Sequence, residues 1–268
     1  MGVLNVTPDS FSDGGRFRAA AGSGGVDLAQ VVDVALEMIA AGADVLDVGG
    51  ESTRPGAEPV SALEECRRVI PVIERLRQLD IMVSVDTRKA EVARQAVAAG
   101  AHLVNDVSGV RDDGMLAVLA ACDAGLCIMH MQGEPGTMQD NPRYRDVVAE
   151  VRAFLAQQVV RCRAAGIGAD RLLLDPGFGF GKTLAHNLAL LRDLEAVRVD
   201  GLPLLAGLSR KRMIGAITGR ATGDRVVGSA VAALLAVQHG ADVVRVHDVP
   251  ATADALKMQA ALAGQPAP

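Results

Sequence analysis

One short phrase recurs along this chain of 268 residues, and it limits the possible folds more than any other feature. It reads AGADVLDVGGE at 41–51, AGAHLVNDVSG at 99–109 and GADVVRVHD at 240–248, with a looser copy, AGLCIMH, at 124–130. In each copy a glycine suited to ending a helix precedes a short apolar run, and a polar residue closes the run. The runs are nearly continuous in apolar residues, which is typical of parallel strands buried on both faces.

Eight apolar runs of this kind predict eight strands, at 2–5, 45–47, 83–86, 103–105, 126–130, 172–175, 204–207 and 243–247. Helical patterns separate them, such as the apolar faces at 31–39 and 147–159. This alternation predicts an α/β fold, and eight near-equivalent units favour a closed (β/α)8 TIM barrel. A doubly wound sheet is the alternative, but no Gly-rich first turn opens the chain. We expect a single domain over 1–268, with 264–268 as a loose tail.

Composition narrows the class of protein further. The net charge is −5, and five Phe, one Tyr and no Trp are too few aromatics for a base-stacking nucleic-acid surface. The longest apolar run, 230–237, is too short to cross a membrane, and no secretory signal opens the sequence. The four cysteines form no C-x-x-C pair, so we expect free thiols in the cytoplasm.

Polar residues stand at or just beyond the carboxyl end of nearly every predicted strand. They are Asn5, Asp47, Asp86, Asn105, His130, Asp175, Ser209, Lys211, Arg245 and His247. In a (β/α)8 barrel the carboxyl ends of the strands and the loops that follow them build the active site. We therefore expect these side chains to meet at one mouth of the barrel and to bind a small molecule there.

Two carboxylates indicate the kind of molecule. Asp86 and Asp175 end strands in an apolar interior, where an unpartnered carboxylate costs several kcal/mol, so each must face a ligand or a cation. A carboxylate can accept the two adjacent N–H groups of a 2-aminopyrimidinone ring, and the Asn105 amide can both donate and accept. The set predicts a site for a flat, amide-rich heterocycle.

The other polar residues predict that an anionic group binds beside this heterocycle. Arg245 and His247 alternate onto the same side of the last strand, and loops after strands seven and eight commonly bind phosphate in barrels. A packed Arg–carboxylate pair is the alternative for Arg245. We expect the Ser209 hydroxyl to cap the following helix. The side-chain oxygen of Asn5 suits Mg²⁺ shared with a phosphate.

The segment PGFGFGKT at 176–183 is similar to a phosphate-binding P-loop, but Pro176 occupies the first Gly position and lacks an N–H. The alternating glycines are better explained by close passage of the backbone past a flat ligand, with Phe180 as an apolar wall. His130 is either a ligand contact or an internally bonded loop residue.

Together the motifs resemble those of the dihydropteroate synthase family, a pterin-binding TIM-barrel family. They are MGVLNVTPDSFSDGG at 1–15, DVGGESTRPGA at 47–57, SVDT at 84–87, NDVSG at 105–109, MHMQG at 129–133, LLLDPGFGFGK at 172–182, SRKRMIG at 209–215 and RVHDV at 245–249. The resemblance implies a transferase of folate biosynthesis that joins 6-hydroxymethyl-7,8-dihydropterin diphosphate to p-aminobenzoate and releases pyrophosphate. It also implies Mg²⁺, a homodimer and inhibition by sulfonamides.

The resemblance assigns roles to individual residues, of which Asp86, Asp175, Lys211 and Arg245 are expected to act in catalysis. The residues implied to bind the pterin are Asp86, Asn105, Asp175 and Lys211. The implied diphosphate contacts are Thr53, Arg245 and His247, with Arg54 near both substrates. The implied p-aminobenzoate neighbours are Ser209, Phe180, Pro55 and Phe11, and the implied Mg²⁺ ligand is Asn5. Asp47 takes an acidic position near the metal.

Two features differ from the family pattern. The chain begins at the first strand, so we expect it to lack an amino-terminal segment, and the loop at 16–25 is long and rich in Gly and Ala. A pterin-binding methyltransferase and a catalytically silent barrel are the competing interpretations. The methyltransferase does not need a diphosphate site, so the Arg245-x-His247 pair and the ESTRPG segment at 51–56 count against it. The retention of every mapped site residue counts against the silent barrel.

Overall fold

The computed structural model describes residues 1–7, 26–52 and 58–264. In the described residues the strands are β1 (Gly2–Asn5), β2 (Val45–Gly49), β3 (Met82–Asp86), β4 (Leu103–Asp106), β5 (Gly125–Met129), β6 (Leu172–Asp175), β7 (Leu205–Ala206) and β8 (Val243–Val244). β1 to β6 pair in parallel in chain order, and β7 pairs with β8. Parallel bridges from Leu174 to Leu204 and from Gly2 to Val246 join the two sheets at both edges. The ring is therefore closed, and the predicted (β/α)8 barrel is confirmed.

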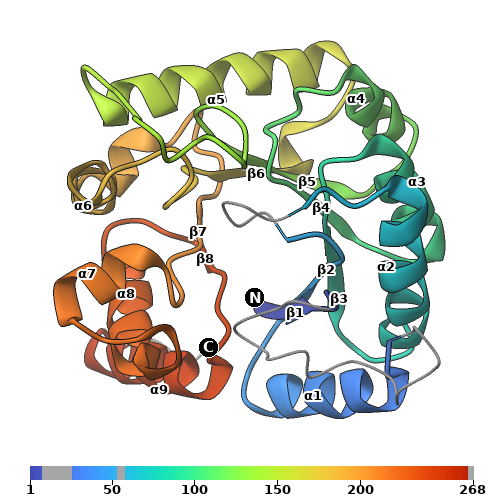
Figure 1. The fold of residues 1–268 in the computed structure, drawn as a ribbon, viewed down its shortest axis with the longest axis horizontal. Coiled ribbons are helices and arrows are strands. Elements are labelled where there is room, and N and C mark those ends of the chain that lie inside the picture. The colour runs from blue at the N-terminus through green and yellow to red at the C-terminus, as the bar shows by residue number, and fades with distance from the viewer. Residues whose placement is uncertain (8–25, 53–57, 265–268) are drawn as a thin grey trace.

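Helices surround the strands on the outside of the ring (Figure 1). They are α1 (Leu28–Ala40), α2 (Ala62–Leu76), α3 (Ala90–Ala99), α4 (Asp113–Ala120), α5 (Val147–Ala164), α6 (Leu184–Arg192), α7 (Arg212–Thr218), α8 (Val226–Gln238) and α9 (Val249–Leu262), with short 3₁₀ turns at Ala169–Arg171, Leu194–Val197 and Thr222–Asp224. Polar side chains start several of them: Asp27 caps α1, Ser61 caps α2 and Asp146 caps α5. None of the described helices is long and apolar enough to span a bilayer.

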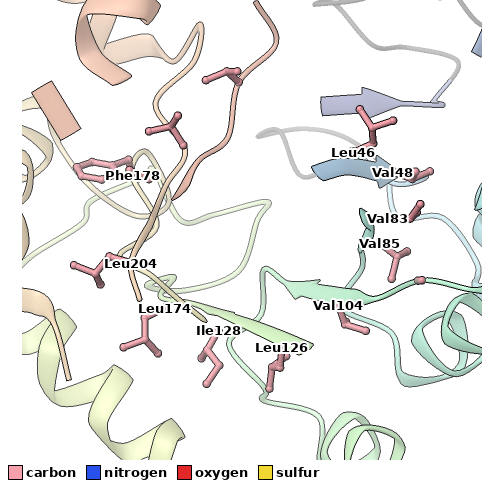
Figure 2. Close-up of a cluster of buried hydrophobic side chains, with 14 of the residues drawn as sticks. Leu46, Val48, Val83, Val85, Val104, Leu126, Ile128, Leu174, Phe178 and Leu204 are labelled. Atoms are coloured by element: carbon pink, nitrogen blue, oxygen red, sulfur yellow. The ribbon is translucent and has the colours of Figure 1, made fainter. Parts of the chain in front are cut away.

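The core lies between the strands and the helices. Successive strand residues point to opposite faces, and the outward series is apolar. Figure 2 shows this layer, which includes Leu46, Val48, Val83, Val85, Val104, Leu126, Ile128, Leu174 and Leu204. A smaller apolar cluster of Leu103, Cys127, Leu173 and Leu205 forms separately. These four alternate with the outward series, so they fill the lower part of the barrel interior and leave its upper part to polar residues.

Several details differ from the sequence-based expectations. β7 and β8 hold only two residues each, because beyond them the pairing is reduced to single bridges. β2 continues to Gly49, so Asp47 lies within the strand rather than at its end. Lys211, not Ser209, is the N-cap residue of α7, and no side chain caps that helix. The expectations for Phe11, Thr53, Arg54 and Pro55, and for the loop at 16–25, lie outside the described residues.

Candidate active site

The inward side chains at the carboxyl ends of neighbouring strands lie at matching levels. Register pairs Asn5 with Gly49, Gly49 with Asp86, and Asp86 with Asn105. A Cβ added at Gly49 would lie 3.1 Å from Oδ1 of Asn5 and 3.7 Å from Cβ of Asp86. The glycine therefore leaves room for these two polar side chains to flank it. The structure brings Asn5, Asp86 and Asn105 to one side of the mouth.

Arg245 joins two carboxylates from neighbouring strands. Its Nε donates to Oδ2 of Asp47 at 2.6 Å, and its Nη2 donates to Oδ2 of Asp86 at 2.8 Å. Asp47 is fully buried and also accepts from the Ser84 hydroxyl at 2.6 Å. Of the two alternatives for Arg245, the structure contains the packed Arg–carboxylate pair. A guanidinium has five N–H donors, so these bonds leave it able to bind phosphate oxygens as well.

Asn105 is only half satisfied by its surroundings. Its Nδ2 donates to Oδ2 of Asp47 at 3.2 Å, and the residue is 2% exposed. Its Oδ1 is buried and has no hydrogen-bond partner within the described part of the chain. Leaving a buried acceptor unpaired costs free energy, so we expect this oxygen to accept a hydrogen bond from a ligand.

The opposite side of the mouth carries Asp175 and Lys211. Oδ1 of Asp175 accepts from the backbone N–H of Gly177 at 2.7 Å. The Lys211 ammonium donates to the carbonyl of Phe178 and lies 4.7 Å from the centre of the Phe180 ring. Its Nζ would also lie 3.9 Å from a Cβ added at Gly207, just after β7. The loop after β6 therefore sets the position of Lys211.

Ser209 and His247 bond to each other across the loops that follow β7 and β8. The Ser209 Oγ accepts from the backbone N–H of His247 at 3.1 Å and lies 3.0 Å from its Nδ1. Between Ser209 and Lys211, Arg210 has a left-handed backbone with φ 57°, and its guanidinium donates to both oxygens of Asp248, at 2.9 and 2.5 Å. These bonds tie the loop after β7 to the loop after β8.

Burial shifts the titration of the groups at the mouth. It raises the pKa of Asp86 to about 7, against the opposing charge of Arg245, with the Asp47 carboxylate as a further raising influence. It also raises the pKa of Asp175, which the positive charge of Lys211 opposes. The pKa of Lys211 is lowered by burial to about 8 although Asp175 favours its charged form. Groups that titrate near neutrality in a cavity are common at functional sites.

An ionic cluster fixes the start of the segment that follows β2. Glu51 pairs with Arg88 at 3.1 Å and with Lys89 at 3.0 Å, and it accepts from the backbone N–H of Val60 at 2.9 Å. Lys89 also pairs at 2.5 Å with Glu65, which is fully buried. Residues 51 and 60 are thus held together, on either side of the predicted substrate residues 53–55.

Sequence reasoning missed two features of the site. Asp47 is among the residues expected at the mouth, but the sequence does not indicate that its carboxylate bonds both Arg245 and Asn105. Gly177 and Gly181 pack closely against protein backbone: a Cβ at Gly177 would lie 1.9 Å from the His130 carbonyl oxygen, and one at Gly181 would lie 2.5 Å from that of Gln132. The glycines of this segment allow two protein loops to approach each other.

A closed (β/α)8 barrel with carboxylates, cations and an unpaired amide oxygen at the carboxyl mouth defines an enzyme of the TIM-barrel class. The family model of pterin binding enzymes matches residues 1–247. Dihydropteroate synthase of Escherichia coli K12 is 48% identical over 259 residues, which cover 96% of this chain and 89% of the relative.

Solved structures of dihydropteroate synthases are similar to this chain in both sequence and fold over almost its whole length. The Yersinia pestis dihydropteroate synthase in a sulfonamide drug complex has a TM-score of 0.92 and 46% identity, covering 98% of this chain and 93% of that one. The Xanthomonas albilineans dihydropteroate synthase with 4-aminobenzoic acid has a TM-score of 0.88 and 51% identity, covering 99% and 93%. The chain belongs to the pterin binding enzymes and, within them, to the dihydropteroate synthase family.

Proposed function

We propose that this chain is a transferase of folate biosynthesis that condenses 6-hydroxymethyl-7,8-dihydropterin diphosphate with p-aminobenzoate to give 7,8-dihydropteroate and pyrophosphate. The observation that carries the proposal is the buried, unpaired Oδ1 of Asn105 beside Asp86, in a mouth that also holds Asp175. A pterin ring presents adjacent N–H donors and ring acceptors, which an amide and two carboxylates can match. Membership of the pterin-binding family supports the same ring.

The ring is held by Asp86, Asn105, Asp175 and Lys211 in this proposal. Carboxylates at Asp86 and Asp175 accept from the ring N–H groups, and Oδ1 of Asn105 accepts a further one. Lys211 donates to a ring acceptor, since an ammonium has three N–H donors and only one is used by the Phe178 carbonyl. These contacts fix the orientation of the ring, and with it the reacting methylene carbon.

The charge balance supports a dissociative substitution at that methylene. Within the described mouth, Asp47, Asp86 and Asp175 face two cations, Arg245 and Lys211, so carboxylates are in excess when all are ionised. An excess of negative charge stabilises positive charge that develops on the ring as the C–O bond breaks, more than it stabilises the neutral substrate. The bond electrons leave with the diphosphate, and the p-aminobenzoate amine, a weak base, attacks the carbon. The new C–N bond gives a cationic nitrogen, which releases one proton to solvent.

The diphosphate tail lies toward Arg245 and His247, with Thr53 and Arg54 as further contacts. Arg245 can bond the tail while two of its N–H groups stay on Asp47 and Asp86. The p-aminobenzoate lies near Ser209 and Phe180, where Pro55 and Phe11 would complete its site. Sulfonamides would inhibit the enzyme by binding at this p-aminobenzoate site.

Mg²⁺ would be held by Oδ1 of Asn5 together with oxygens of the diphosphate. In the described part of the chain no group of three or more His, Cys, Asp or Glu could hold a metal ion. Mg²⁺ commonly takes one or two protein oxygens and fills its other positions with phosphate oxygens and water, so the Asn5 amide fits this mode. The ion would neutralise charge on the departing diphosphate.

A cytoplasmic homodimer is the proposed state of the protein. Free thiols at all four cysteines support a reducing compartment. Apolar side chains exposed on α7, α8 and α9 support an interface there: Ile217, Val227, Val231, Leu235, Met258 and Leu262. On α8 three of them are four residues apart and share one helix face. Light scattering of the purified chain tests the mass, and Val227→Glu should yield a monomer.

Turnover tests the function directly. The purified chain is incubated with both substrates and Mg²⁺, and pyrophosphate and 7,8-dihydropteroate are measured together. Asp175→Asn should abolish most of the turnover, whereas Asp170→Asn, an exposed aspartate at the amino end of β6, should leave it unchanged. Absence of product from the wild-type chain, or equal activity of the two variants, would contradict the proposal.

A further inference from the structure

Lys182 is a buried lysine that the proposed chemistry does not use. It ends the Gly-rich segment at 176–182 and is only 3% exposed. Its Nζ lies 2.9 Å from Nδ1 of His130, 2.9 Å from the carbonyl oxygen of Gly177 and 3.0 Å from that of Phe180. A lysine with three close partners inside the protein is not placed to bind a phosphate.

These three contacts are satisfied in either charge state of Lys182. An ammonium donates one N–H to each carbonyl and one to a neutral His130. A neutral amine donates to the two carbonyls and accepts from His130 protonated at Nδ1. Burial lowers the pKa of His130 to about 2, with the charges of Lys182 and Arg111 as further causes, so its ring stays neutral. Lys182 and His130 therefore bond each other and the loop carbonyls, and they do not form a ligand-binding site.

The pair lies at the seam between two loops of the mouth. His130 directly follows β5, and its ring packs edge-on against Phe154 of α5 with centroids 5.0 Å apart. The glycines at 177 and 181 have positive φ and leave no space for a Cβ against the backbone of 130–132. Lys182 thus bonds the loop after β6 to a support that is anchored on α5.

The same loop positions groups that face the substrates. The Phe178 carbonyl accepts from Lys211, and the Phe180 ring lies beneath the Lys211 ammonium. The Gly177 N–H donates to Asp175. Lys182 holds the carbonyls of Gly177 and Phe180, the residues on either side of Phe178 and Gly179. Displacing these carbonyls would displace both the acceptor and the ring that locate Lys211.

We propose that Lys182, through its bonds to His130 and to the carbonyls of Gly177 and Phe180, is a positioning residue that fixes the loop at 176–182 so that Lys211 and Phe180 meet the substrates. This role rests on the proposed function for its substrates. It needs no phosphate contact by Lys182, although the sequence resembles a P-loop at this point.

Lys182→Met tests the proposal, because methionine keeps the stem and removes the N–H donors. We expect the KM for p-aminobenzoate to rise about tenfold and amide hydrogen exchange over 176–182 to accelerate by a similar factor, the loss that goes with one or two buried hydrogen bonds. Lys257→Met on the exposed face of α9 is the matched control and should change neither. A purely structural role would reduce only the amount of active enzyme, leaving KM and local exchange at wild-type values, and that result would overturn the proposal.

A second pair of variants decides the matter if Lys182→Met does not fold. His130→Asn keeps an acceptor near the position of Nδ1 and should retain most of the wild-type KM, whereas His130→Leu should raise it. Equal KM values for the two variants would overturn the proposal. Because exchange over 176–182 needs no turnover, the inference and the proposed reaction can fail separately.

Discussion

Replacing Arg245 by methionine should destabilise the protein, and more at alkaline pH than at acidic pH. The change removes two charge-assisted hydrogen bonds, of 2.6 Å to Asp47 and 2.8 Å to Asp86. Asp47 is fully buried, Asp86 is 15% exposed and Arg245 is 20% exposed. Removing one partner of a buried ion pair costs about 3–5 kcal/mol. Because Arg245 is partly exposed, we expect the lower end, about 3 kcal/mol above neutral pH.

The dependence on pH follows from the titration of Asp86. Burial already raises its pKa to about 7 from an ordinary 3.8, while Arg245 opposes the rise, so in the variant the pKa moves above 7. A carboxyl whose pKa is raised by folding favours the native state at low pH, and that contribution is lost as pH rises through the folded pKa. The wild type loses this stabilisation as the pH rises to about 7, and the variant continues to lose stability as the pH rises further. Each unit of extra shift adds about 1.4 kcal/mol to the difference.

Urea unfolding at about pH 5.5 and pH 8.5 measures this difference in free energy. We expect the variant to be less stable than the wild type at both values, with a gap at least about 1.4 kcal/mol larger at pH 8.5. Arg163→Met is the control, because its ion pair with Asp200 is exposed, 42% and 53%, and should cost under about 1 kcal/mol at either pH. A gap for Arg245→Met that is the same at both pH values would show that Arg245 does not hold down the pKa of Asp86.

Further predictions concern other groups at the mouth. Asp86→Asn should lower kcat more than about 100-fold without lowering the melting temperature, because the substitution removes a charge that burial disfavours, and kinetics with thermal unfolding check both parts. Since the pKa of Lys211 is about 8, the ammonium is present below that pH, so kcat/KM should fall above it and Lys211→Arg should remove this alkaline limb from the pH profile. Asp248→Asn should cost about 1–3 kcal/mol in urea unfolding, because it weakens a bidentate bond to Arg210. Chelation of Mg²⁺ should stop turnover while calorimetry still detects binding of a pterin without phosphates.

The barrel could be predicted because its strands are buried on both faces. Runs such as 172–175 are continuously apolar and end in a polar residue, so each strand and its carboxyl end are visible in the sequence. β7 and β8 were harder, since only two residues of each keep regular pairing and their ends depend on neighbouring strands.

The positions of the polar residues at the mouth could be predicted from the sequence, but most of their hydrogen-bond partners could not. Asp86, Asn105 and Asp175 could be placed at strand ends from the sequence alone. That Arg245 bonds Asp47 and Asp86 depends on side-chain reach across the barrel, between residues 159 or more positions apart. Likewise, the bond of Lys182 to His130 arises from two loops that approach each other, and neither segment indicates it separately.

A crystal structure of the chain with the dihydropterin diphosphate bound would show directly which residues hold the pterin ring. We expect density for the flat ring among Asp86, Asn105 and Asp175, with Oδ1 of Asn105 accepting a hydrogen bond from the ring and Lys211 donating to it. A ring bound elsewhere, or one that leaves the Asn105 oxygen unpaired, would contradict it.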